Sequence, residues 1–213
     1  MSMDMGQTSL VRLHLTPDSF ETFECSVPIT LGLYTESLVG CLQKAKSSKL
    51  MWKINNNTTL SVILLHEDQT TEFQIRAIDI EEDQLDIPNM DDDMALQVDA
   101  TVMREWTDKM MMTKAECQFQ ITREKFQWSS TATEFGTITH CEPLNGKRIE
   151  SLAVRNTVDI TLSSQAVKAM SMFSHCGSTC MLGFSNGQPS RLKVDLLYGS
   201  HLCLFVAPKI VDN

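Results

Sequence analysis

The sequence lacks a long apolar run and an excess of positive charge. No stretch approaches the roughly 20 apolar residues that a membrane span needs, and the first residues, MSMDMGQTSL, lack the basic and then apolar pattern of a secretory signal. We therefore expect an intracellular protein that makes no contact with a membrane. With 27 acidic residues against 18 lysines and arginines, the formal net charge is −9. This balance excludes a protein whose whole surface coats nucleic acid, but it permits a local basic face.

Catalytic and metal-binding motifs are also scarce. The sequence contains no glycine-rich phosphate loop, no H-E-x-x-H and no G-x-S-x-G. The densest metal-like cluster, His175-Cys176 with Cys180, lacks a second cysteine pair, which argues against zinc. Residues 91–93 are all aspartate but lack the spacing and later glutamate of a calcium loop, so we expect a solvated loop there. We expect no enzyme, no metal and no cofactor.

Short runs rich in Val, Ile, Leu, Phe and Thr make up most of the chain. Several alternate with period two, which predicts half-buried strands of predominantly antiparallel sheets. The runs lie at residues 9–15, 28–34, 49–54, 60–66, 72–78, 94–100, 116–122, 126–130, 136–141, 158–163, 180–185, 191–198 and 201–207.

Three windows have apolar residues at helical spacing instead: 35–46, 99–112 and 163–175. Their candidate N-caps are Thr35, Asp99, and Ser163 or Ser164. The plan is one helix followed by about four strands, repeated, which predicts an α+β fold. Ile-Thr-Leu at 29–31 and again at 160–162 suggests a faint internal duplication. Between the repeats, residues 78–94 contain eight acids around Pro88, which predicts an extended linker.

Three segments together resemble the proliferating cell nuclear antigen family, the eukaryotic sliding clamps. They are SMDMGQTSLVRLHL at 2–15, IDIEEDQLDIP at 78–88 and FVAPKIVDN at 205–213. The resemblance implies the DNA clamp, or processivity, fold with two similar helix-plus-antiparallel-sheet domains. These would be a first domain at 1–78, an interdomain connecting loop at 79–93 and a second domain at 94–213. Because the similarity starts partway into the family's pattern, it also implies a shortened first domain without its initial strand and helix.

The resemblance implies a function as well. We expect a nuclear homotrimeric ring that a clamp loader places around double-stranded DNA, and that tethers DNA polymerase and repair proteins. Strands 71–78 and 135–141 would join neighbouring subunits. A hydrophobic pocket would bind partner peptides, with Gln7 and Phe205 standing where the family has histidine and tyrosine. Its residues would be Met3, Gln7, Leu85, Ile87, Pro189, Phe205, Ala207, Pro208, Lys209 and Ile210.

The residues themselves leave alternatives open at the pocket. Leu85 and Ile87 alternate in an acidic loop, so they either capture a peptide or simply pin the linker to the core. The tail HLCLFVAPKIVDN likewise has two uses. Its part up to Val206 reads as a last strand, and 207–210 as the floor of the partner pocket.

The helical windows expected to face DNA carry little net charge. Their cations expected to face DNA are Lys44, Lys46, Arg104, Lys109 and Lys168. Four acids lie in the same helical windows, and the family's Arg-Cys-Asp-Arg is here 24–27, Glu-Cys-Ser-Val. We therefore expect weak DNA affinity, and each lysine could equally belong to a solvated helix face. The alternative function is a clamp-derived docking or competitor module that binds partner peptides without being loaded on DNA.

Overall fold

The computed structural model describes residues 2–3, 8–45, 48–79 and 91–209. The chain divides into two compact units. The larger unit combines 1–23 with 89–213, and the smaller unit comprises 24–88. The domain boundaries expected from the sequence remain a prediction. Within the described ranges, no helix has the length and apolar character needed to cross a bilayer.

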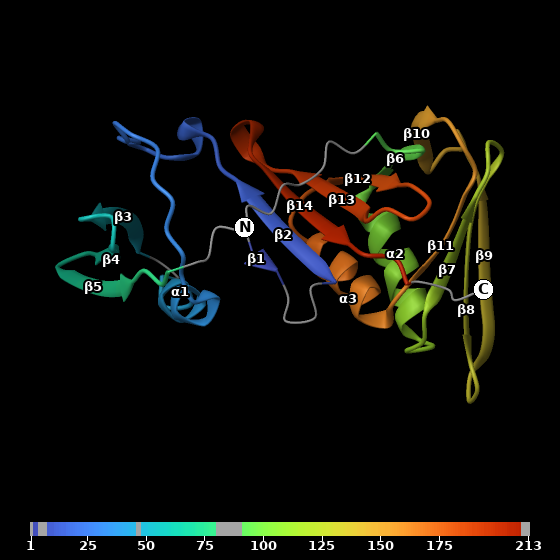
Figure 1. The fold of residues 1–213 in the computed structure, drawn as a ribbon, viewed down its shortest axis with the longest axis horizontal. Coiled ribbons are helices and arrows are strands. Elements are labelled where there is room, and N and C mark those ends of the chain that lie inside the picture. The colour runs from blue at the N-terminus through green and yellow to red at the C-terminus, as the bar shows by residue number, and fades with distance from the viewer. Residues whose placement is uncertain (1, 4–7, 46–47, 80–90, 210–213) are drawn as a thin grey trace. The chain divides into compact units, whose positions relative to one another are not determined.

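The larger unit contains a seven-stranded and a four-stranded sheet, in which every neighbouring pair is antiparallel (Figure 1). The first has the order β1 (Ser2–Met3), β2 (Ser9–His14), β14 (His201–Val206), β13 (Ser190–Asp195), β12 (Thr179–Phe184), β6 (Met94–Asp99) and β10 (Ile149–Val154). The second has the order β11 (Val158–Leu162), β7 (Cys117–Ile121), β8 (Lys125–Ala132) and β9 (Gly136–Pro143).

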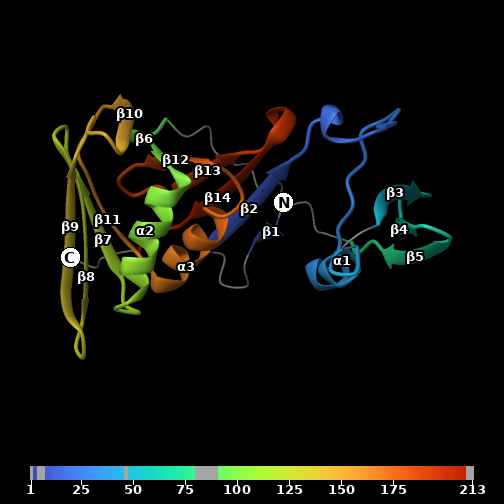
Figure 2. The same ribbon diagram turned by 180° about the vertical axis from the view of Figure 1, so that it is seen from behind.

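Two helices of the larger unit pack against each other, α2 (Ala100–Met111) and α3 (Ser164–Phe173), and lie side by side in both views (Figure 2). Both begin at predicted N-caps. The Asp99 carboxylate accepts a hydrogen bond from the Thr101 N–H at 2.7 Å, and the Ser163 hydroxyl accepts one from the Ala166 N–H at 3.2 Å. These bonds satisfy N–H groups that have no partner inside the helix.

The core of the larger unit contains a buried group of aromatic side chains. Trp106 of α2 stacks on Phe126 of β8 with ring centroids 4.7 Å apart, and both side chains are buried. The Trp106 indole N–H donates to Glu142 Oε1 at 3.0 Å, so its one polar atom has a partner. This contact connects α2 to the four-stranded sheet.

The smaller unit consists of one helix on a three-stranded antiparallel sheet. Helix α1 (Thr35–Leu42) packs on the sheet of β3 (Lys49–Asn55), β4 (Thr59–His66) and β5 (Gln69–Arg76). The buried apolar cluster is Cys41, Leu60, Val62, Leu64 and Ile75. Thr35 is not the N-cap as expected, because that position belongs to Tyr34, which makes no side-chain capping bond.

The α+β class predicted from the sequence is confirmed, with two local differences. Residues 28–34 were expected to form a strand, but only Gly32 pairs, in an isolated bridge with Ile78. Leu31 and Leu33 still pack against the core of the smaller unit, so the apolar alternation reports burial rather than strand pairing. Strand β10 was missed, and its register shifts between Ser151 and Ala153, which breaks the period of two.

Candidate functional site

The predicted pocket residue Phe205 lies on the face of the seven-stranded sheet that points away from the helices. Its neighbours Leu204 and Val206 are buried in the core, whereas Phe205 is half-buried, as alternation along a strand requires. Phe205 lies opposite Leu10 of β2 on one side and Arg191 of β13 on the other. The three side chains therefore form a row across the sheet, with an aromatic ring between an apolar and a cationic neighbour.

The chain after Phe205 is held in place at its backbone. The Ala207 N–H donates to the Thr8 carbonyl and the Lys209 N–H to the Thr161 carbonyl, each at 2.8 Å. The Lys209 ammonium also forms an ion pair with Glu116. Ala207 is exposed and Pro208 half-buried, so the tail after Val206 leaves the core and runs along the surface.

The structure brings together only part of the predicted pocket. Pro189 is half-buried and directly precedes β13, where Ser190 pairs with Val206, so it lies at the same end of the sheet as Ala207 and Pro208. Strand β1 pairs with β2 through Met3 and Leu10, which places the Met3 backbone beside the same row. The side chain of Met3 and the predicted positions Gln7, Leu85, Ile87 and Ile210 lie outside the described residues.

The ion pair between Asp92 and Arg191, which lies beside this row, was not predicted from the sequence. Asp92, expected in a solvated loop, is only 6% exposed and pairs with Arg191, so that expectation is wrong. Room for its carboxylate comes from Gly183 of β12, where an added Cβ would clash with the Asp92 carboxylate. Burial raises the pKa of Asp92, and the Arg191 guanidinium opposes this shift.

The neighbours of Asp92 are also tied to the larger unit. The Asp93 N–H donates to the Ser185 hydroxyl at 2.9 Å, and the Asn156 side chain donates to Asp93 Oδ1 at 2.7 Å. Asp91 lies 3.3 Å from Arg155. Each of the three aspartates thus has its own polar partner, which fixes where the chain enters β6.

The predicted DNA-facing positions differ in how their charges are used. On α2, the Arg104 guanidinium donates to the Ser174 carbonyl at 3.0 Å, and Lys109 pairs with Glu105 at 2.6 Å. Lys168 of α3 and Lys44, which follows α1, are exposed. Lys46 lies outside the described residues.

One further cation modifies the charge of α2. Arg148 lies 2.5 Å from Glu105 and 3.1 Å from Glu142, so Glu105 has two cationic partners. These partners hold the pKa of Glu105 below its ordinary value. The hydrogen bond from Lys109 contributes most to this shift, and the hydrogen bond from Arg148 contributes next. The charge of Glu105 is therefore partly neutralised by a residue that lies outside the helix.

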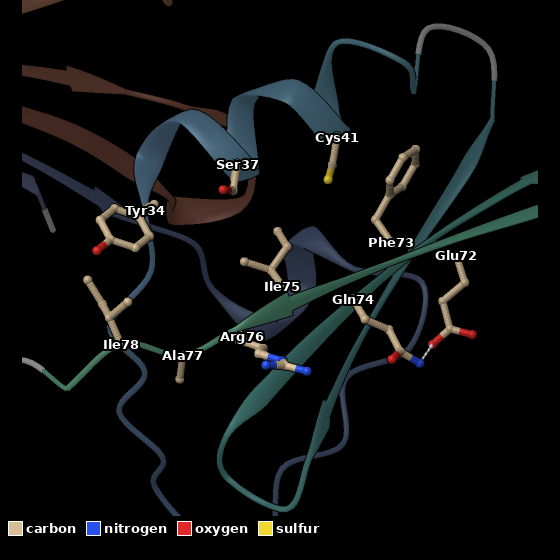
Figure 3. A pocket seen from close by; sticks show the side chains of 10 residues that line it. All are labelled: Tyr34, Ser37, Cys41, Glu72, Phe73, Gln74, Ile75, Arg76, Ala77 and Ile78. Carbon is tan, nitrogen blue, oxygen red and sulfur yellow. Dashed lines mark hydrogen bonds between the residues drawn. The ribbon is translucent and has the colours of Figure 1, made fainter.

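The two strands expected to join subunits are both sheet edges. Strand β5 ends the three-stranded sheet and β9 ends the four-stranded sheet, and within the described ranges neither has a partner on its outer side. A hollow of about 560 Å³ opens beside β5 in the smaller unit (Figure 3). Its apolar lining includes Tyr34, Phe73 and Ile78, with the Tyr34 ring largely exposed.

No group of three potential metal ligands occurs among the residues that the structure describes. Within the cluster singled out from the sequence, Cys180 is buried and Cys176 is exposed. Burial raises the pKa of the Cys180 thiol to about 11. A protonated thiol is a poor metal ligand.

Comparison with known proteins gives matches along the whole chain. The family model for the N-terminal domain of proliferating cell nuclear antigen matches residues 1–103. The proliferating cell nuclear antigen of Saccharomyces cerevisiae is 22% identical over 220 residues, covering 100% of this chain and 85% of the relative. The DNA polymerase sliding clamp of Methanobrevibacter smithii is 22% identical over 215 residues, covering 100% of this chain and 84% of the relative. Proliferating cell nuclear antigen 2 of Plasmodium falciparum is 22% identical over 228 residues, covering 99% and 86%.

Proposed function

We propose that this chain, which belongs to the proliferating cell nuclear antigen family of DNA polymerase sliding clamps, acts as a polymerase processivity factor. Three copies would close into a ring around duplex DNA and would tether replication and repair proteins. The loading would be done by a clamp loader, and the eukaryotic relatives favour a nuclear location. Such a protein holds other enzymes on DNA and has no catalytic site of its own.

The observation that carries the proposal is that the two strands expected to join subunits, β5 and β9, each lie at the edge of a sheet, one on each unit of the chain. A head-to-tail contact between β5 of one subunit and β9 of the next would use both edges of every subunit. Such heterologous contacts close into a ring when the rotation between subunits allows it. The hollow beside β5 supports this contact, because it could receive an apolar side chain from the neighbouring subunit.

The partner pocket would centre on the row of Leu10, Phe205 and Arg191, with Ala207 and Pro208 at its end. Apolar anchors in such a pocket supply affinity, and the edge of a connecting loop supplies backbone hydrogen bonds. A peptide with the pattern Gln-x-x-hydrophobic-x-x-aromatic-aromatic should bind saturably, and Leu85→Ala with Ile87→Ala should abolish binding. Unchanged binding by that variant would refute the pocket assignment.

DNA binding would be weak and independent of sequence. A clamp needs cations that face phosphates without reading bases. Among the described candidates, Lys168 and Lys44 are exposed, whereas Lys109 is engaged by Glu105. We expect a shallow slope when the logarithm of the affinity for duplex DNA is plotted against the logarithm of the salt concentration, because few phosphates would be neutralised.

The sparse cationic charge favours one second candidate, a docking or competitor module that keeps the partner pocket but is not loaded on DNA. The two proposals differ in the mass of the particle in solution and in polymerase stimulation. Light scattering after size exclusion should give the mass of a trimer for a clamp, and Tyr34→Asp should reduce it to a monomer while Tyr34→Phe should not. A monomer at high concentration that stimulates no polymerase would leave only the second proposal.

A further inference from the structure

Two neighbouring turns of the larger unit expose large apolar side chains at one end of the seven-stranded sheet. One turn follows β2 and contains the short helix η1 (Pro17–Ser19), and the other joins β13 to β14 and contains η2 (Leu197–Gly199). Because His14 pairs with His201 in register, the two turns leave the sheet side by side, and they contact each other. Leu197 and Tyr198 are 78% and 67% exposed. We call the exposed side chains of Phe20, Phe23, Leu197 and Tyr198 the turn surface.

Hydrogen bonds make the turn surface rigid. The Thr16 hydroxyl donates to the Tyr198 carbonyl at 2.7 Å, and the Thr16 N–H donates to the Ser200 hydroxyl at 3.0 Å. The Ser19 and Ser200 hydroxyls are 2.6 Å apart, and Ser200 is buried. A surface that is already ordered loses little conformational entropy when it binds a partner.

The backbone conformation of Tyr198 also indicates a binding surface. Tyr198 has φ 57° and ψ 31°, a left-handed conformation that is rare for a bulky residue. Its side chain does not pack into the core, so burial does not explain why a tyrosine occupies this position. Residues held in such conformations cluster at binding sites. The strain here presents an aromatic ring to solvent.

The charge of the two turns selects the partner. Segments 15–23 and 195–200 contain Asp18, Glu21 and Asp195 and no lysine or arginine. The Asp195 carboxylate is paired with Lys193 of β13 at 2.8 Å, and Glu21 also has an interaction of its own, so the exposed Asp18 is the acid that the turns offer to a partner. The rings of Phe20 and Phe23 lie 5.6 Å apart and, with Tyr198, offer faces for cation–π contacts.

We propose that the turn surface docks a short protein segment in which arginine or lysine alternates with leucine or aromatic residues. The apolar side chains of that segment would cover Leu197 and Tyr198, and its cations would meet the Asp18 carboxylate and the ring faces. A second copy of this chain fits less well, because a symmetric contact would bring the same acids together. The proposal is independent of the ring and of the pocket around Phe205.

The test uses the full chain and a fluorescein-labelled peptide in which arginine alternates with leucine and tryptophan. Its binding is measured by fluorescence anisotropy and compared with that of a peptide carrying glutamate in place of arginine. We expect saturable binding of the arginine peptide alone. Leu197→Ser with Tyr198→Asn should weaken binding at least tenfold, and asparagine tolerates the left-handed backbone. Met172→Ser with Leu152→Ser is the matched control, because these exposed apolar residues lie elsewhere in the larger unit.

A second pair of variants separates local from overall charge. Asp18→Asn should weaken binding severalfold, whereas Asp108→Asn, which changes the net charge equally, should leave it unchanged. Equal loss in these two variants, equal binding of both peptides, or full binding by the Leu197 and Tyr198 variant would overturn the proposal. So would sedimentation showing that the chain self-associates through Leu197 and Tyr198. A parallel titration with the pocket peptide shows whether that separate site is intact.

Discussion

Replacing Arg191 with methionine should destabilise the larger unit strongly, because it leaves the buried Asp92 carboxylate without its cation. Methionine keeps an apolar stem of similar reach, so little packing is lost. Removing one partner of a buried ion pair costs about 3–5 kcal/mol. Oδ1 of Asp92 has no hydrogen-bond partner among the described residues, and besides Arg191 the charge is attracted more weakly by Arg155. We expect a loss in that range at neutral pH.

The loss of stability caused by Arg191→Met should become smaller as the pH falls. Burial raises the pKa of Asp92 above its ordinary value of 3.8, with Arg191 opposing. Between the unfolded and folded pKa values the native state binds more protons than the unfolded state, so this group destabilises the fold as pH rises through that window. Without Arg191 the folded pKa rises further. The difference in the free energy of unfolding between Arg191→Met and the unsubstituted protein should therefore vanish as the pH approaches 3.8.

The opposite replacement, Asp92→Asn, should be much milder. It removes the charge but leaves the Arg191 side chain, which is 35% exposed and can be solvated. We expect a cost of about 1 kcal/mol, typical of one lost hydrogen bond. The double variant should resemble Asp92→Asn alone, so the coupling between the two positions should equal the cost of Arg191→Met, about 3–5 kcal/mol.

The assay is urea unfolding followed by circular dichroism at pH 7 and at pH 5, with Lys193→Met as the control. Lys193 pairs with Asp195 at 2.8 Å on the exposed surface, so its loss should cost at most about 1 kcal/mol. An Arg191→Met variant no less stable than Lys193→Met, or a gap independent of pH, would refute the reasoning.

Three further results are expected from the same core. Gly183→Ala should lower the free energy of unfolding by about 1–3 kcal/mol, since the added methyl would clash with Asp92, and Asp92→Ala should restore part of it in thermal melts. Trp106→Ala should cost about 3–5 kcal/mol in urea unfolding, and a cost below 1 kcal/mol would contradict the enclosed core. Burial and a pKa of about 11 should protect Cys180 from a thiol reagent at neutral pH until the chain unfolds, so early labelling there would contradict the fold. The exposed thiols, which should react first, are Cys25, Cys141 and Cys176.

The helices were predictable because their local signals agree. In α2, Trp106 and Met110 of the predicted apolar stripe are buried, Val102 of that stripe is half-buried, and Asp99 caps the first turn. Helix α1 shows the limit of such signals. The spacing of Leu38 and Cys41 predicted this helix. Thr35, the predicted N-cap, is instead the first helical residue, and the N-cap position is occupied by Tyr34.

The row around Phe205 could not be read from the sequence, because it depends on strand register. Alternation predicts that Phe205 faces away from Leu204, but it does not identify the neighbours of either residue. Those are set by β14 pairing with β2 and β13, and a slip of one residue would turn Phe205 to the other face of the sheet. Arg191 therefore enters the site only through the structure.

The burial of Asp92 shows why composition misjudges a run of like charges. Three successive aspartates are usually solvated, and Asp91 is indeed exposed. The next residue, Asp92, lies against Gly183 of β12, which has no side chain, and pairs with Arg191 of β13, so this carboxylate has both room and a cation. Neither Gly183 nor Arg191 is near residue 92 in the sequence. Because Arg191 also borders Phe205, any peptide that fills the proposed pocket would meet a guanidinium whose charge is already shared with Asp92.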